Sequence, residues 1–115
     1  MAYNHDLARR IEEAFLRFEI DYEIKKMFGG AAFMVKDKMC VGVMQDQLMA
    51  RIGPKHYDAA LKKTGVHEMN FTGRPMKGYV FVDYDQLTQD QSLDEWITLC
   101  LRFNPFAKTS KRKTK

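Results

Sequence analysis

The stretch IKKMFGGAAFMVKDKMCVGV, residues 24–43, decides the fold, because it consists of short apolar segments separated by turn residues. Two of these segments flank Lys36-Asp37-Lys38, a polar connection that is short enough for a β-hairpin. Gly29-Gly30 separates another pair of segments in the same way. Together with the residues around it, the stretch predicts four strands, over residues 22–28, 31–36, 39–45 and 47–52.

Three helices are predicted around these strands, from apolar periodicity and from helix-start signals. The first has apolar residues every three or four positions, at Leu7, Ile11, Phe15 and Phe18. The second begins at Gly53-Pro54, because proline is favoured in the first turn of a helix. The third is predicted to begin near Ser92, in a capping box with Glu95, and to end at Asn104-Pro105.

Two shorter strands, over residues 66–71 and 79–83, complete the predicted order α-β-β-β-β-α-β-β-α. Runs of strands joined by short loops, with helices beside them, are typical of α+β domains rather than of alternating βαβ units. We therefore expect an antiparallel sheet of about five to six strands with flanking helices. The predicted domain covers residues 1–107, and a basic segment over residues 108–115 is expected to be disordered.

Length, composition and cysteine usage indicate a single cytoplasmic domain. Of the 115 residues, 45% are hydrophobic and 30% are charged, as in ordinary globular proteins. The chain has no apolar run of the ~20 residues that span a bilayer, and charged residues interrupt its N-terminal segment. We expect neither membrane association nor secretion. Cys40 and Cys100 lack the spacing of metal or redox motifs and are interpreted as packed thiols.

The net charge of +4 belongs to the end of the chain. The last eight residues, KTSKRKTK, contain five of the nineteen Lys and Arg and no acid, which leaves fourteen bases against fifteen acids elsewhere. If the protein binds nucleic acid, we expect weak binding without sequence preference through this tail, because it lacks groups that read bases. The cations concerned are Lys108, Lys111, Arg112, Lys113 and Lys115. The alternative is a solubilising segment with no partner.

No catalytic, cofactor or metal site is predicted. Gly29-Gly30 has neither the GxxxxGK[ST] nor the GxGxxG spacing of a phosphate loop. It is interpreted as a structural bend, where glycine either permits positive φ or lets an aromatic side chain such as Phe28 cross closely over the backbone. The histidines are dispersed, and acid pairs such as Asp83/Asp85 fall in a turn or beside a helix cap. Four cations could gather an anion, although a solubilising loop is the simpler interpretation; they are Lys25, Lys26, Arg74 and Lys77.

Methionine is unusually frequent, with eight in 115 residues. In the predicted strands both alternating sets of side chains are largely apolar, whereas helices at the ends of the sheet comfortably cover one face. Either loops and the third helix bury the second face, or that face binds a subunit or partner through Met34, Met44 and Met49. The second interpretation predicts a homodimer, which is the commonest symmetric oligomer, or another protein partner.

Four segments resemble the N-terminal domain of the TfoX/Sxy family: KKMFGGAAFMVKDKMCVGV, QLMARIGPKHYDAAL, GVHEMNFTGRPMKGYVFVD and DEWITLCLRFN. They lie within about residues 20–104. The resemblance implies an α+β domain with an antiparallel sheet and without established catalytic residues. Two-domain members are bacterial regulators of natural competence, thought to act with the cyclic-AMP receptor protein at promoters. The sequence has no room for their second domain, so we expect a stand-alone member.

Three classes of function follow from these observations. The first is a non-catalytic regulatory module that binds a protein partner, with a role in transcription regulation and competence implied by the resemblance. The second is a stand-alone domain that binds a small ligand between the sheet and the helices, without a bound cofactor. The third, and the least favoured, is a small enzyme whose site the sequence motifs do not reveal.

Overall fold

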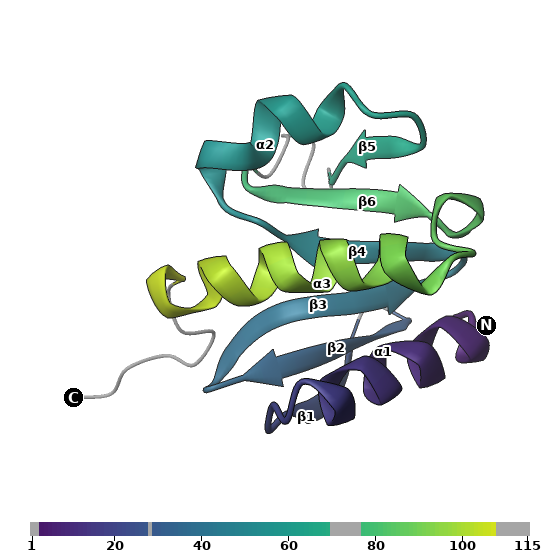
Figure 1. Cartoon of the computed structure of the whole chain (residues 1–115), viewed down its shortest axis with the longest axis vertical. Coiled ribbons are helices and arrows are strands. Elements are labelled where there is room, and N and C mark those ends of the chain that lie inside the picture. The colour runs from purple at the N-terminus through teal and green to yellow at the C-terminus, as the bar shows by residue number, and fades with distance from the viewer. Residues whose placement is uncertain (1–2, 28, 70–76, 108–115) are drawn as a thin grey trace.

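The computed structural model describes residues 3–27, 29–69 and 77–107, and its elements follow the predicted order (Figure 1). They are α1 (His5–Arg17), β1 (Glu23–Met27), β2 (Gly30–Val35), β3 (Lys38–Met44), β4 (Gln47–Arg51), α2 (Pro54–Leu61), β5 (Val66–Glu68), β6 (Tyr79–Asp83) and α3 (Asp90–Phe103). Two single-turn 3-10 helices, Tyr84–Gln86 and Asn104–Phe106, flank α3. None of the described helices has the length and hydropathy of a membrane-spanning segment.

The six strands form one sheet in the order β1-β2-β3-β4-β6-β5, and every neighbouring pair is antiparallel. The first four strands form a meander, because their connections are too short for anything but a reversal of the chain. Between β2 and β3, Lys36 and Asp37 have φ angles of 55° and 66°. Positive φ at both central residues is what a two-residue type I′ turn requires. The predicted α+β fold with an antiparallel sheet is confirmed.

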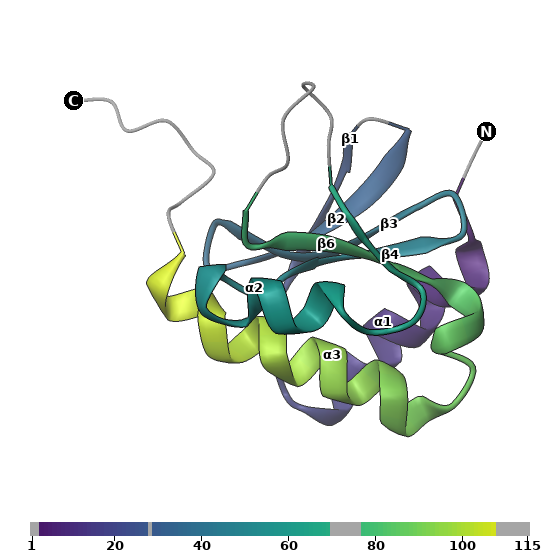
Figure 2. The ribbon, with the colours of Figure 1, turned by 90° about the horizontal axis from the view of Figure 1, so that it is seen from above.

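All three helices lie on one face of the sheet (Figure 2). Helix α3 contacts β3 and β4 in the middle of the sheet, α1 packs beside it, and α2 contacts β5 and β6. The possibility that the third helix covers the second face of the sheet is therefore wrong. The core lies between the helices and their face of the sheet, where the rings of Phe15, Tyr22 and Phe33 form an aromatic cluster.

The second face of the sheet carries a buried apolar strip that none of the described helices covers. Ala32, Gly42 and Met49 lie side by side on β2, β3 and β4. A Cβ atom on Gly42 would stand 2.5 Å from the Met49 methyl group, so the glycine makes room for the methionine. Met34 and Met49 are only 3% and 1% exposed, and Met44 is half-buried. In this conformation Met34 and Met49 therefore offer almost no surface to a partner.

Helix boundaries follow local signals except at the start of α3. The side chain of Asn4 caps α1, with Oδ1 accepting a hydrogen bond from the Leu7 N–H at 2.9 Å. Helix α3 begins at Asp90, because the backbone carbonyl of Gln89 accepts the first N–H groups. Ser92 therefore lies inside the first turn, and the predicted capping box with Glu95 is wrong.

Cys40 and Cys100 are free thiols buried in the core, as the sequence predicts. Cys40 has no partner on β2, because Phe33 pairs with Val41 while Met34 pairs with Met39, and it turns toward the core beside Val41. Burial raises the pKa of the Cys40 thiol to about 12 and raises the pKa of Cys100 well above its ordinary value. Both groups are therefore protonated thiols at neutral pH, which are poor nucleophiles.

We expect native protein at neutral pH to react slowly with dithionitrobenzoate, because neither thiol is accessible or ionised. After denaturation both cysteines should react rapidly, which provides the full-signal control. Absorbance of the released nitrothiobenzoate measures the reaction. Rapid release of one equivalent from the native protein would contradict the burial of that thiol.

Candidate functional site

A groove runs between α2 and α3, and most of the residues that line it are apolar. It consists of two adjoining cavities of about 340 Å³ and 310 Å³, which share His56 and Leu99. We call it the α2–α3 groove and define it by the residues that line the two cavities. They are Ile52, Pro54, Lys55, His56, Ala59, Ala60, Lys63, Glu95, Trp96, Leu99, Arg102, Phe103 and Phe106.

The floor of the groove is apolar and comes mainly from α3. Trp96, Leu99 and Phe103 follow one another at spacings of three and four residues, so they lie on one side of the helix. Phe106, on the 3-10 turn after α3, is 80% exposed. Gly53 allows α2 to begin close to α3, because a Cβ atom at this position would stand 2.4 Å from the Phe103 ring.

The rim of the groove is cationic. Lys55 and Lys63 come from α2 and the turn after it, and Arg102 comes from α3. Within the described parts of the chain, none of these three exposed cations forms an ion pair. The Lys63 ammonium lies 5.7 Å from the centroid of the Trp96 ring, close enough for a cation–π interaction. Glu95 is the only carboxylate among the lining residues.

Hydrogen bonds to the sheet hold the turn that carries Phe106. The buried amide of Asn104 donates from Nδ2 to the Val35 carbonyl at 3.3 Å. The Lys38 ammonium donates to the carbonyl oxygens of Asn104 and Pro105, at 3.1 Å and 3.3 Å. A cation at this position also complements the negative end of the α3 dipole. The exposed phenyl ring of Phe106 therefore projects from an anchored turn.

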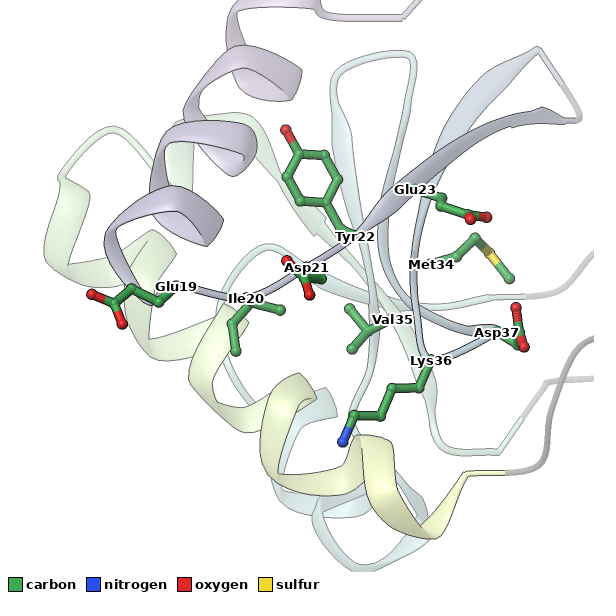
Figure 3. A pocket seen from close by; sticks show the side chains of 9 residues that line it. All are labelled: Glu19, Ile20, Asp21, Tyr22, Glu23, Met34, Val35, Lys36 and Asp37. Atoms are coloured by element: carbon green, nitrogen blue, oxygen red, sulfur yellow. The ribbon is translucent and has the colours of Figure 1, made fainter.

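A second depression, of about 560 Å³, has the opposite charge (Figure 3). It lies where the α1–β1 connection meets the β2–β3 turn, and Lys36 is the only cation that lines it. Its four carboxylates spread around the rim and do not converge on one point; they are Glu19, Asp21, Glu23 and Asp37. Across the described residues, no group of three or more side chains could hold a metal ion.

A polar cluster on the second face joins residues that are distant in sequence. Asp83 Oδ2 lies 3.0 Å from His67 Nε2, and Asp83 Oδ1 accepts a hydrogen bond from Gln47 Nε2 at 3.0 Å. The hydrogen bond to His67, followed by that from Gln47, lowers the pKa of Asp83. Sequence reasoning missed this pair, because the pairing of β5 with β6 creates it. Among the described residues, no hydroxyl or thiol is hydrogen-bonded to the pair as a nucleophile would be.

The four cations predicted as an anion patch do not all come together. Lys25 and Lys26 are successive residues of β1, so their side chains point to opposite faces of the sheet. Lys77 is exposed just before β6, and Arg74 lies outside the described residues. The five cations of the tail, Lys108, Lys111, Arg112, Lys113 and Lys115, also lie outside them. Nucleic-acid binding by the tail stays a prediction.

Comparison with known families places most of the chain within one described domain. The family model described as the TfoX N-terminal domain matches residues 15–104. The match covers the whole sheet, α2 and α3, and therefore every residue of the α2–α3 groove except Phe106. No curated protein and no solved structure matches the chain.

Proposed function

The chain belongs to the TfoX N-terminal domain family, and from this premise we propose that it is a non-catalytic regulatory module that binds a segment of another protein in the α2–α3 groove. The observation that carries the proposal is an apolar floor bordered by exposed cations, with Phe106 projecting 80% exposed beside it. Exposed apolar surface with a polar border is typical of protein interaction sites. The regulatory part of the proposal, in transcription and competence, rests on the resemblance to TfoX/Sxy proteins alone.

Two features of the chain support binding over catalysis. The thiols, which are its most nucleophilic side chains, are buried in the core and their raised pKa values keep them protonated. The His67–Asp83 pair could hold a proton, but its described hydrogen-bond partner is the amide of Gln47. Within the described residues, no hydroxyl or thiol is hydrogen-bonded to the pair for it to activate as a nucleophile.

Site-specific photo-crosslinking in the native host cells tests the proposal. A photoreactive amino acid in place of Leu99 is expected to form one discrete protein adduct, because that side chain lies on the groove floor. The matched control places the same group at Leu16, which is 69% exposed on α1 and does not line the groove. Mass spectrometry identifies the adduct, and an adduct of twice the 13.5 kDa chain would indicate a homodimer.

The identified protein is then purified, and calorimetry measures its affinity for the full-length chain. The substitution Leu99→Glu is expected to weaken binding by at least about tenfold, because it places a charge on the apolar floor. Leu16→Glu should leave the affinity unchanged. The absence of an adduct specific to position 99, or equal affinities of the two variants, would overturn the proposal.

A small-ligand-binding domain is the second candidate. The larger cavity of the groove, at about 340 Å³, lies near the lower end of the ~300–1,000 Å³ range of ligand pockets. A thermal-shift screen against metabolites, nucleotides and DNA separates the two candidates. A small molecule that raises the melting temperature of the wild type, but not of Leu99→Glu, would favour ligand binding over protein binding.

A further inference from the structure

We infer that the segment bound in the α2–α3 groove is an acidic amphipathic helix. Its apolar side would lie on Trp96, Leu99 and Phe103, and its carboxylates would pair with the cations of the rim. The inference rests on the proposed function and adds the chemistry of the partner to it. Shape and charge support it independently.

The shape of the groove fits about two turns of a helix. With a rise of ~1.5 Å per residue, the seven steps along the helix from Trp96 to Phe103 cover about 10 Å of α3. The wall opposite α3 is formed by α2, where Ala59 is small and exposed, so a helix of the partner can approach closely. Helices that bind in grooves use apolar anchors at positions i, i+3 or i+4, and i+7, which is the same span.

The charge of the groove selects an acidic partner. Three cations, Lys55, Lys63 and Arg102, face one carboxylate, Glu95, whereas the chain without its last eight residues has a net charge of −1. The carboxylates concentrate elsewhere, as in the depression of Figure 3. Because the three cations form no ion pair with any described residue, a ligand carboxylate can pair with them without breaking an existing bridge. Complementary potentials attract acidic partners and exclude basic ones.

The apolar floor favours a helix over a nucleic acid in this groove. Phosphates would pair with the cations but would leave Leu99 and Phe106 without an apolar partner. An amphipathic helix satisfies both, because its apolar and acidic residues lie on adjacent faces. A DNA oligonucleotide is therefore compared with the peptides in the experiment, which distinguishes nucleic-acid binding from helix binding.

The experiment uses Trp96, the single tryptophan of the chain, as a fluorescent reporter inside the groove. The probe is a synthetic peptide of about 15 residues without tryptophan, a length at which helices are marginal until they bind. It carries Phe and Leu at helical spacing and Glu on both flanks, and a matched peptide has Lys in place of every Glu. The acidic peptide is expected to shift the Trp96 emission saturably and to bind more weakly as salt is raised. The Lys peptide should give no shift.

A charge-reversed double variant tests whether two of the rim cations, Lys55 and Lys63, attract the acidic peptide. In Lys55→Glu/Lys63→Glu, affinity for the acidic peptide should fall by at least about tenfold, since like charges then face each other. The same variant should gain affinity for the Lys peptide. Lys62→Glu, which changes an exposed cation that does not line the groove, should behave as wild type. Circular dichroism establishes that each variant is folded.

Several results would overturn the inference. One is equal binding of the two peptides, and another is full affinity of the double variant for the acidic peptide. A DNA oligonucleotide that shifts the Trp96 emission in the wild type, but not in the double variant, would assign the groove to nucleic acid. If the protein crosslinked at Leu99 docks through a segment without acidic residues, the inference fails while the proposed function stands.

Discussion

Replacing Phe33 with alanine is expected to lower the free energy of unfolding by about 3–5 kcal/mol, the range for removing a buried phenyl ring. Phe33 is fully buried, and its ring centroid lies 5.9 Å from that of Phe15 on α1 and 5.8 Å from that of Tyr22. The substitution would leave a cavity where α1 meets the sheet. Because domains of this kind are stable by only ~5–15 kcal/mol, the loss would be a large part of the total.

Denaturation in urea, followed by circular dichroism, measures this effect, and Ile24→Ala is its matched control. Ile24 lies directly opposite Phe33 on β1 but is 41% exposed. Its truncation should therefore cost no more than about 1 kcal/mol. Similar losses for the two variants would show that the aromatic cluster does not hold α1 to the sheet.

Replacing Gly30 with valine is expected to cost about 3 kcal/mol, at the upper end of the usual range for overpacking. A Cβ atom at Gly30 would stand 2.2 Å from the carbonyl oxygen of Val43. That oxygen belongs to the backbone of β3, so it cannot move aside as the end of a flexible side chain can. The sequence interpretation attributed the glycine pair to positive φ or to an aromatic side chain crossing the backbone. In the structure Gly29 has the positive φ, and the close approach of the β3 backbone requires Gly30.

Gly29→Ala is the control that separates the two causes. Gly29 has a φ of 77°, and an added Cβ would meet no described residue within 4 Å apart from its chain neighbours. This variant should therefore lose only about 1 kcal/mol, the penalty of a left-handed conformation. Thermal unfolding measures the loss of stability in each variant and shows which of the two is larger. If Gly29→Ala proved as costly as Gly30→Val, the clash with Val43 would not be the cause.

Local sequence was sufficient to predict the order of the elements and the antiparallel meander. Lys36-Asp37 reverses the chain within a two-residue turn, Asn4 caps α1, and Pro54 opens α2. Each signal acts on backbone within a few positions of itself, so it can be recognised without knowing the rest of the fold. The same holds for Asn104-Pro105, which ends α3.

Local sequence misplaced the features that depend on contacts between distant elements. The capping signal of Ser92 was overridden, and α3 starts at Asp90, whose carboxylate accepts a hydrogen bond from Arg10 of α1 at 3.0 Å. Alternation in the strands showed that both sheet faces are apolar, but it did not show that Met34 and Met49 are buried within the chain. Burial depends on what packs above a side chain, which strand periodicity does not contain.

The sequence alone determined which side chains the candidate site has available, and only the tertiary structure determined that they form a site. Trp96 and Leu99 can be read as an apolar stripe of one helix, and Lys55 and Lys63 as cations on or beside another. They face each other because α2 and α3 pack on the same face of the sheet (Figure 2). The physical reason is that propensity and periodicity act within one element, whereas a groove exists only between two elements that pack together.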